Sequence, residues 1–519
     1  MSDFKDNLSR RGFIAGAALA TAGLGLSACA PRTEKEQPIA STGDDSQGIS
    51  WDYEADVVIV GAGGAGLMAA DAAHENGASA IVLESQSMVG GDTFTCGCFV
   101  TAPWPETTKK GSGANLTDEE YVVQWKKDFE LTRPYSNLAL AGGELPAETP
   151  LSDRQLELTS DMFQRTADLG VEWTFWEECE WFPGAEGTLF SGQFVASNRV
   201  IPSLEAAVGG YEDVEILTNA EAYDLVVQDG RAIGVLADVF GARTAVKARK
   251  GVILSTGSFT HNRSLLAENM PANVGFPSCG TPGITGLGHQ MAVRAGANLR
   301  DMDLGLHWFC ASFGSAEQTD TLATVQAVHG GAAGAVEGIL VNAKGKRYVN
   351  ECNGYSHTGY YTSQQPYQSG WYITDAAGAP YLPVDDEAYL KVQAETLDEL
   401  AGKIPVDKEG LLAEIERYNG YVEAGEDPDF GKNMNCPKIE TAPFFAFPMY
   451  PRFYVTYGGI ETDPDSHVLN ATGDPIPGLY AAGLCTGSYG AQEGFFYPGG
   501  LGQALVFGRQ AGRLAVTEN

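Results

Sequence analysis

The sequence predicts an α/β fold that begins with a strand, a helix and a second parallel strand, and three observations lead to this prediction. Residues 57–60 form a short apolar run, which is typical of a buried parallel strand. Residues 61–66 carry glycines at the spacing GxGxxG and lead into a helical stretch over 67–76. A second apolar run, 80–83, ends at the acidic residue Glu84. This order predicts a Rossmann-like dinucleotide-binding unit.

Each part of the unit has a physical task. Gly61 permits the tight turn, Gly63 lets backbone approach a pyrophosphate, and Gly66 lets the helix pack closely on the strand. The helix N-terminus presents free N–H groups to the phosphates, and Glu84 can accept hydrogen bonds from ribose hydroxyls. The predicted cofactor-binding residues of this unit are Gly61, Ala62, Gly63, Gly64, Ala65, Gly66 and Glu84.

A second glycine pair follows Glu84. Residues 90–93, GGDT, resemble the GG-x-[ST] element of the fumarate reductase and succinate dehydrogenase flavoproteins, the FAD-dependent oxidoreductase 2 superfamily. The resemblance covers about residues 53–515. It implies FAD as the cofactor, and a Rossmann-like FAD-binding domain with an inserted α+β capping domain.

Further motifs carry the resemblance along the chain. The strand 250–259 ends in a Thr-Gly pair like the family's ATGG element, and 283–299 resembles GDGxxMAxxAGA with Leu287 where Asp is usual. Residues 345–351 match GxRFxNE, and 477–483, PGLYAAG, is the family's flavin-contacting turn. The cofactor contacts that the resemblance implies are Gly90, Gly91, Asp92, Thr93, Ala222, Thr256, Gly257, Gly483, Gly499 and Leu501.

Local patterns predict several other elements. Residues 117–132 and 152–169 read as helices, the second opening on Ser152 as N-cap. Short strands over 214–252 are expected to turn at Asp229 and Gly230, and a hairpin over 338–351 at Lys344 and Gly345.

The length of 519 residues exceeds what one core normally supports, so two domains are expected. The predicted segments are a twin-arginine signal with a lipobox at 1–29, a linker at 30–50, the FAD-binding domain at 51–300 and 445–519, and a capping or substrate domain at 301–444.

The N-terminus is interpreted as a targeting segment. Residues 9–13, SRRGF, match the twin-arginine export pattern, and 26–29, LSAC, resemble a bacterial lipobox. The apolar stretch 14–26 is too short to span a bilayer. We therefore expect an exported protein of the cell envelope, on the outer face of the cytoplasmic membrane or in the periplasm, that contacts membrane only through a lipid on Cys29.

Charge and cysteine spacing limit the partners. A formal net charge of -34 argues against nucleic acid, because such a surface repels phosphate. The chain has no CxxCH for covalent haem and no CxxC for a cluster or zinc, so no metal site is predicted. The close pair Cys96 and Cys98 is either redox active or, as small buried residues usually are, part of the packing.

The resemblance also points to the active site, where this chain departs from fumarate reductases. Four residues beyond Glu351, where those enzymes carry an arginine proton donor, stands Tyr355. Tyr497 stands at the position of the carboxylate clamp, and Val455 replaces the histidine of the family's HTxGG. The loss of these cations makes a small dianion an improbable substrate. Tyrosines at both places resemble the NExxxY and YPG elements of 3-ketosteroid dehydrogenases.

The resemblance gives each residue a role. Tyr355, a phenol with a reference pKa of about 10, would donate a proton to, or remove one from, a carbon next to a carbonyl. Tyr497 and the N–H of Gly500 would bind the carbonyl oxygen, although the stretch after Tyr497 is about three residues shorter here than in those dehydrogenases. His307 lies near the family's substrate-facing histidine, one residue short of its spacing, with Trp308 as the alternative.

We therefore expect an FAD-dependent reductase of a C=C bond conjugated to a carbonyl in an apolar small molecule, such as a ketosteroid or enone. Its electrons are expected from a membrane-bound donor, either a cytochrome or a quinol-linked protein. Three alternatives stay open: a 3-ketosteroid-type dehydrogenase working in the oxidative direction, a flavin electron-transfer or ligand-binding lipoprotein, and a fumarate-reductase-like reductase of an unsaturated acid.

Overall fold

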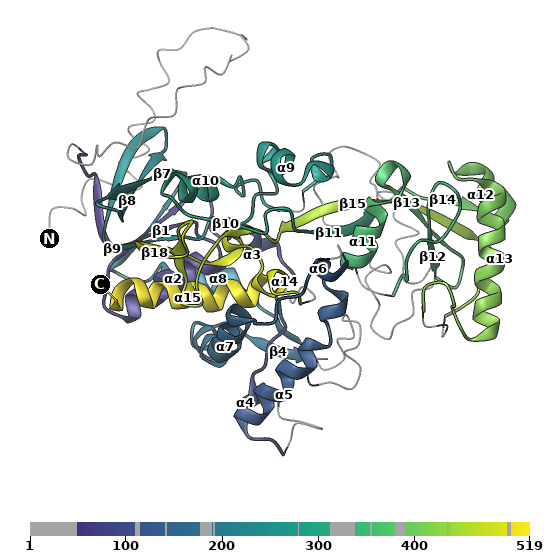
Figure 1. Cartoon of the computed structure of the whole chain (residues 1–519), viewed down its shortest axis with the longest axis horizontal. Coiled ribbons are helices and arrows are strands. Elements are labelled where there is room, and N and C mark those ends of the chain that lie inside the picture. Colours follow the sequence, from purple (N-terminus) through teal and green to yellow (C-terminus); the bar gives the residue numbers. More distant parts are fainter. Residues whose placement is uncertain are drawn as a thin grey trace, which may run out of the picture. The chain divides into compact units, whose positions relative to one another are not determined.

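The structure is a computed structural model that describes residues 49–108, 115–140, 143–176, 189, 193–278, 280–311, 338–352, 355–378, 390–432, 434, 436–495 and 500–518 (Figure 1). The chain separates into two units, Met1–Asp45 and Ser46–Asn519, and every described residue belongs to the second. The predicted export signal, the lipobox with Cys29 and most of the linker lie outside the described residues. No helix in the described ranges is long and apolar enough to cross a bilayer.

The main sheet has the strand order β17-β18-β9-β1-β2-β6. Its bounds are β17 His467–Leu469, β18 Pro475–Ala481, β9 Ala242–Leu254, β1 Tyr53–Val60, β2 Ala80–Glu84 and β6 Val214–Thr218. All neighbours from β18 to β6 are parallel, and β17 is antiparallel. The predicted α/β class with its Rossmann-like unit is confirmed.

Strand β1 has apolar side chains on both faces of the sheet, and both faces are buried. Val57 and Ile59 pack in one cluster with the helices α2 (Gly64–Glu75), α8 (Val200–Val208) and α15 (Gly500–Thr517). Val58 and Val60 pack in the other cluster, beneath β7 (Ala220–Gln228), β8 (Arg231–Val239) and α10 (Leu287–Arg294). Figure 1 shows α15 running beside α2.

Two glycines explain how closely α15 approaches α2. An ideal Cβ at Gly508 would lie 2.2 Å from the carbonyl oxygen of Ala65, and one at Gly512 would lie 2.2 Å from that of Ala69. Helix α15 therefore packs directly against the backbone of α2, the helix that follows the glycine loop, and holds α2 in position.

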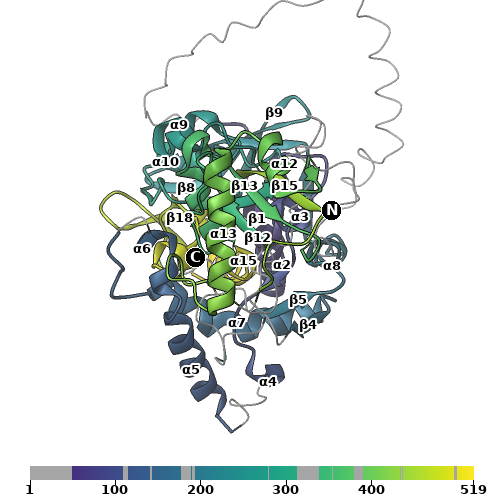
Figure 2. The ribbon, with the colours of Figure 1, turned by 90° about the vertical axis from the view of Figure 1, so that its right-hand side faces the viewer.

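The middle region builds a second sheet of order β11-β15-β13-β12, with β14 on β15. Its strands are β11 Gly305–Ala311, β12 Gly338–Val341, β13 Gly370–Thr374, β14 Val392–Ala394 and β15 Phe444–Thr456. The helices α12 (Leu397–Lys403) and α13 (Lys408–Ala424) share its core, and Figure 2 shows α13 in front of β12 and β13. Because β15 pairs with β11, β13 and β14, residues 445–456 belong to this sheet. The predicted division into domains stays a prediction.

The remaining elements are short. A small sheet of order β3-β5-β4 contains β3 Phe99–Val100, β5 Gln193–Ala196 and β4 Trp173–Trp176, and β10 (Leu299–Arg300) pairs with β16 (Gly459–Ile460). The other helical segments are α3 Gly91–Thr95, α4 Pro105–Thr108, α5 Asp118–Glu130, η3 Arg133–Tyr135, α6 Asn137–Leu140, α7 Pro150–Asp168, α9 Arg263–Asn269, η5 Pro271–Asn273, α11 Tyr355–Ser363, η8 Pro366–Gln368, η10 Gly483–Thr486 and α14 Tyr489–Gln492.

Three local predictions are confirmed. Thr117 caps α5 in a capping box with Glu120. Asp229 and Gly230, both with positive φ, turn β7 into β8. The chain also turns at Lys344 and Gly345, although only one bridge, Val341 to Arg347, pairs the second arm.

The predicted start of α7 is wrong. The helix begins at Pro150, and its N-cap residue is Thr149 rather than Ser152. Its first amides are satisfied from far along the chain, because the Glu493 carboxylate accepts from Leu151 N at 2.9 Å and Ser152 N at 2.8 Å. A local pattern cannot reveal a cap supplied by a residue 341 positions away.

Candidate cofactor and active site

The carboxyl ends of four parallel strands meet at one edge of the main sheet. Val60 at the end of β1 is in register with Leu83 of β2 and with Leu254 of β9, and Leu254 is in register with Ala481 of β18. The predicted residue Glu84 ends β2, and Gly61, Thr256, Gly257 and Gly483 lie within three residues of the other strand ends. This edge is where parallel α/β sheets bind ligands.

The glycine loop has the backbone geometry that its sequence predicts. Gly61 has a φ of 101°, and a Cβ there would lie 2.4 Å from the Ser255 carbonyl oxygen. A Cβ at Gly66 would lie 1.9 Å from the Gly61 carbonyl oxygen. Any side chain at these two positions would separate β1 from β9 or from α2, so the glycines are needed for the close packing.

The second glycine pair lies against the first loop. Gly90 N donates to Ala62 O at 2.9 Å, and Gly64 N at the start of α2 donates to the Thr93 hydroxyl at 3.2 Å. Gly90 and Gly91 have φ values of 131° and 49°, which favour glycine at both places. The two motifs, 24 residues apart from Gly66 to Gly90, thus form one surface.

Glu84 is held at the end of β2. Its carboxylate, 6% exposed, accepts from Ala62 N at 2.9 Å and from Gln86 N at 2.8 Å. A carboxylate has about four lone-pair positions, and the Ser85 hydroxyl is a third donor at 3.3 Å. Glu84 therefore keeps acceptor capacity for a ribose hydroxyl. The sequence predicted the acidic residue but not its bond to the glycine loop.

Two observations fit a bound dinucleotide at this edge. Gly63, the N-cap of α2, has no side chain to cap the helix, and within 4 Å a Cβ there would meet only Gly90 O, at 3.7 Å. The Asp92 carboxylate accepts from Thr281 N at 2.7 Å through Oδ1, whereas its Oδ2 is buried without a hydrogen-bond partner. Burial raises the pKa of Asp92 above its usual value, against the bonds from Thr281. Thr281 had no motif that marked it.

The other predicted contacts have varied surroundings. Gly257 and Gly483 have positive φ, and Gly288 at the start of α10 lies so close to Thr256 that a Cβ would be 2.1 Å from its hydroxyl. Ala222 and Leu501 are buried in the clusters on opposite faces of the main sheet.

The predicted catalytic residues are placed only in part. Tyr355 is the first residue of α11, His307 lies on β11 opposite Phe453, and Gly500 opens α15. Helix α11 packs on β11 and β15, so Tyr355 and His307 belong to two elements that are in contact with each other. The side chains of Tyr355 and His307, and the whole of Tyr497 and Gly499, lie outside the described residues.

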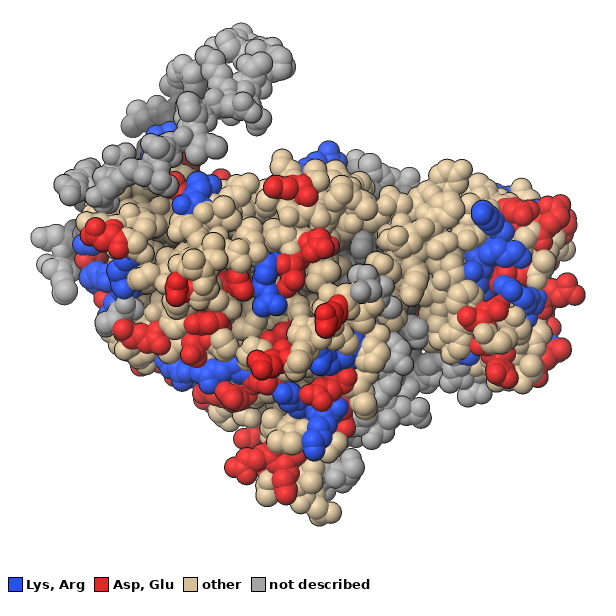
Figure 3. Space-filling view, viewed as in Figure 1, with Lys and Arg blue, Asp and Glu red and all other residues tan. Residues whose placement is uncertain are grey.

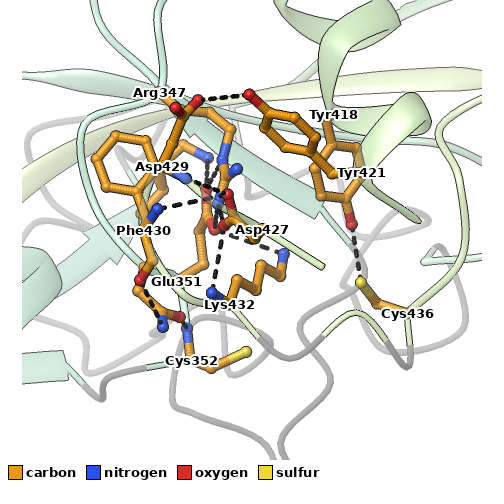
Figure 4. A network of polar contacts seen from close by, with 12 residues as sticks. Arg347, Glu351, Cys352, Tyr418, Tyr421, Asp427, Asp429, Phe430, Lys432 and Cys436 are labelled. Carbon is orange, nitrogen blue, oxygen red and sulfur yellow. Dashed lines mark hydrogen bonds and ion pairs between the residues drawn. The ribbon is translucent and has the colours of Figure 1, made fainter. Parts of the chain in front are cut away.

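A buried group of charges lies directly before α11, and we call it the ion cluster: Arg347, Glu351, Asp427 and Lys432 (Figure 4). Arg347 donates to Glu351 at 2.9 Å and to Asp427 at 3.0 Å, and Lys432 Nζ lies 3.5 Å from Glu351. Burial opposes ionisation of Glu351, but Lys432 and Arg347 hold its pKa below the usual value.

The ion cluster is also tied to the second sheet. Glu351 accepts from Leu340 N at 2.9 Å, and Lys432 donates to Gly338 O at 2.6 Å, so both bind β12. The GxRFxNE motif thus fixes the chain one helical turn before Tyr355. Its sequence gave no sign of Asp427 and Lys432, which come from the segment after α13.

The residues that follow Val455 form a tight buried turn. Val455 is 3% exposed, and Gln492 donates to the carbonyl oxygens of Tyr457 at 2.9 Å and Thr486 at 3.2 Å. Phe495 stacks on Phe129 with ring centroids 4.4 Å apart, so it packs within the protein.

Comparison with known proteins places the chain among flavoproteins. Residues 182–499 match the family model described as FAD binding domain, and residues 56–307 match one described as FAD dependent oxidoreductase. The digoxin reductase of Eggerthella lenta is 28% identical over 98% of this chain and 96% of its own. The cytochrome-type fumarate reductase of Shewanella frigidimarina is 28% identical over 93% of this chain and 79% of its own. The solved 3-ketosteroid-Δ4-(5α)-dehydrogenase of Rhodococcus jostii RHA1 has a TM-score of 0.70 and 26% identity over 91% of this chain and 99% of its own.

Proposed function

We propose that this chain reduces a C=C bond conjugated to a carbonyl in a neutral, apolar substrate. The chain belongs to the FAD binding domain family. It is an FAD-dependent oxidoreductase that reduces or dehydrogenates C=C or CH–CH groups of small molecules. The observation that carries the proposal is the phenol-bearing residue Tyr355 at the first position of α11, directly after the ion cluster. Fumarate reductases carry an arginine there.

FAD, when bound, supplies the hydride, and the chain's residues supply position and a proton. Tyr355 donates its phenolic proton to the carbon next to the carbonyl. Tyr497 and the N–H of Gly500 hold the carbonyl oxygen, which gains negative charge as the double bond is reduced. The ion cluster holds α11 in place, so the donor is presented at a fixed position.

The apolar substrate class is supported by what replaces the family's cations. Val455, buried in β15, stands where HTxGG has a histidine, and Tyr355 stands where an arginine would bind or protonate a carboxylate. An apolar residue and a phenol cannot pair with a dianion. The similarity to a digoxin reductase along nearly the whole chain also favours a reductase of a small molecule.

The same site supports the reverse reaction, desaturation of a ketosteroid, because Tyr355 can remove the proton that it otherwise donates. The similarity to a 3-ketosteroid-Δ4-(5α)-dehydrogenase favours this second candidate.

We also propose export through the SRRGF segment, with a lipid on Cys29 and a membrane-bound cytochrome or quinol-linked protein as the electron donor. The similarity to a cytochrome-type fumarate reductase supports such a donor. Metabolic labelling with a radioactive fatty acid tests the anchor: wild type should be labelled and Cys29→Ala should not.

The experiment is anaerobic reoxidation of the reduced flavin by a panel of steroid enones, simple enones and unsaturated acids. The wild type should be reoxidised by an enone and not by fumarate. Tyr355→Phe should keep its flavin absorbance and lose turnover by at least 100-fold, the range of a general acid. Tyr360→Phe, on the same helix, is the matched control and should turn over normally. Full activity of Tyr355→Phe would refute the proposed proton donor, and indifference to every substrate would favour an electron carrier.

A further inference from the structure

Two cysteines lie beside the cofactor loop without a part in the proposed reaction. Cys96 and Cys98 follow α3, and their sulfur atoms are 3.9 Å apart. A disulfide bond is about 2 Å long, so the two sulfurs must approach by roughly 2 Å to bond. Cys96 is partly exposed and Cys98 is buried, which leaves Cys96 as the sulfur that a partner in solution can reach.

The surroundings of Cys98 favour a thiolate. The Arg199 guanidinium lies 3.9 Å from Cys98 Sγ and donates to Cys96 O at 2.9 Å. The N-terminus of α8 also faces this sulfur, because Val200 N donates to it. A hydrogen bond from the Cys96 thiol, then the bonds from Val200 and Arg199, lower the pKa of Cys98 to about 6 although burial opposes them. A cation and a helix N-terminus are the features that activate cysteines.

Cys485 gives a contrast within the same protein. Its thiol is fully buried and donates to the carbonyl oxygens of Leu254 and Ala482. Burial raises the pKa of Cys485 to about 11. At Cys485, burial alone gives a thiol that stays protonated. Cys98 differs because a cation and a helix N-terminus face its sulfur.

The backbone around the pair is strained. Cys98 has a φ of 57° and Arg199 a φ of 68°, and neither is a glycine. Left-handed conformations are unfavourable in residues that carry a Cβ. The two strained residues are in contact, since the Arg199 guanidinium lies beside Cys98 Sγ. Strained backbone of this kind clusters at functional sites.

From these contacts we infer that Cys96 and Cys98 form a second redox site, a dithiol that exchanges two electrons with a small-molecule disulfide. In the reducing direction, a thiolate RS⁻ attacks Cys96 Sγ of the intramolecular disulfide, and Cys98 Sγ leaves as the thiolate that its surroundings stabilise. A second thiol RSH then attacks the outer sulfur of the mixed disulfide on Cys96, Cys96 Sγ leaves and takes the proton of that thiol, and RSSR is released. One S–S bond breaks and one forms, the two cysteines gain two electrons, and the products are the Cys96 thiol, the Cys98 thiolate and RSSR.

Redox titration tests this site. The FAD-loaded full chain is equilibrated under nitrogen with oxidised and reduced dithiothreitol at a series of ratios, its free thiols are alkylated, and the peptide containing both cysteines is weighed by mass spectrometry. We expect one midpoint at which half of this peptide escapes alkylation and has lost the mass of two hydrogen atoms. Cys98→Ser should never form the intramolecular bond. Full alkylation of the wild-type peptide at every ratio would overturn the site.

Arg199 provides a second, more specific test. Arg199→Met removes the cation that stabilises the reduced, thiolate form, so the disulfide becomes relatively more stable. The ratio of reduced to oxidised dithiothreitol at the midpoint should rise about tenfold, which is about 30 mV for two electrons. Arg243→Met, at an exposed position on β9, is the control and should leave the midpoint unchanged. Equal midpoints for the two variants would overturn the tuning by Arg199 and with it the thiolate argument.

Discussion

The carboxyl edge of the main sheet and the ion cluster are built in opposite ways. At the sheet edge, the glycine loop is positioned by close backbone approach, including that of Ser255, and by hydrogen bonds to Glu84, Gly90 and Thr93, which lie within 35 positions of the loop. In the ion cluster, side-chain charges join Arg347 and Glu351 to Asp427 and Lys432, about 80 positions away. The first arrangement suits a cofactor common to a family. The second positions α11, the helix that begins at the proposed proton donor Tyr355. Changes in one should spare the function of the other.

On the face shown in Figure 3, acidic side chains are interspersed with basic ones. The net charge of -34 is therefore not expressed there as one acidic patch. Internal contacts, rather than surface charge, therefore distinguish the sheet edge from the ion cluster.

The largest expected effect is at the sheet edge. Gly66→Ala would place a Cβ 1.9 Å from the Gly61 carbonyl oxygen, and neither β1 nor α2 can move away without opening the core. We expect a protein that retains no flavin, measured as the ratio of flavin to protein absorbance, and melts many degrees lower.

Gly420→Ala is the matched control, because a Cβ at Gly420 in α13 would meet nothing within 4 Å. It should keep its flavin and gain up to about 1 kcal/mol in free energy of unfolding, the usual helix preference for Ala over Gly. Normal flavin content in Gly66→Ala would show that the loop is not the cofactor cradle.

This contrast also explains what sequence could predict. The glycine loop, Glu84 and the second glycine pair were predictable because their spacing in the chain is itself the geometry. The structure places them at one edge of the main sheet. The partners Thr281, Asp427 and Lys432 were not, since a residue held by a distant charge or hydroxyl leaves no periodic mark. The start of α7 failed for the same reason, because Glu493 caps it from afar.

The next effect is in the ion cluster. Lys432→Met removes a fully buried cation from Glu351, which leaves the carboxylate with less compensation for its lost hydration. Removing one member of a buried pair typically costs about 3–5 kcal/mol. We expect a loss in that range by urea unfolding and reduced turnover, with the flavin still bound.

Lys403→Met is the control for this prediction. Lys403 pairs with Glu399 on the surface, where both side chains are almost half exposed. Such pairs contribute less than about 1 kcal/mol. If the two lysine variants were equally stable, the ion cluster would not hold the region before α11.

A smaller change at the sheet edge tests the link between the two glycine motifs. Thr93→Val removes the hydroxyl that accepts from Gly64 N at 3.2 Å. The loss of one such bond is about 1 kcal/mol, so FAD should bind roughly fivefold more weakly in a fluorescence titration. Thr95→Val, which removes an exposed hydroxyl that donates to Asp92 O, should bind FAD as the wild type does. Equal weakening by both would indicate a general effect on α3.

The smallest effect separates the regions by pH. His467 lies between Asp463 at 2.8 Å and Glu518 at 2.7 Å, and the bond to Asp463, then the bond to Glu518, raise its pKa to about 9 against burial. Since this exceeds the unfolded value of about 6.5, the stabilisation is complete below pH 6.5 and is lost as pH rises through 9. After allowance for solvent screening we expect about 1 kcal/mol.

Melting curves from pH 6 to 9.5 should show this loss in the wild type and not in His467→Gln. The ion cluster should add nothing over this range, because the lowered pKa of Glu351 keeps it ionised throughout and Arg347 stays charged. An equal pH dependence in both proteins would mean that His467, between Asp463 and Glu518, is not the group whose titration changes the stability.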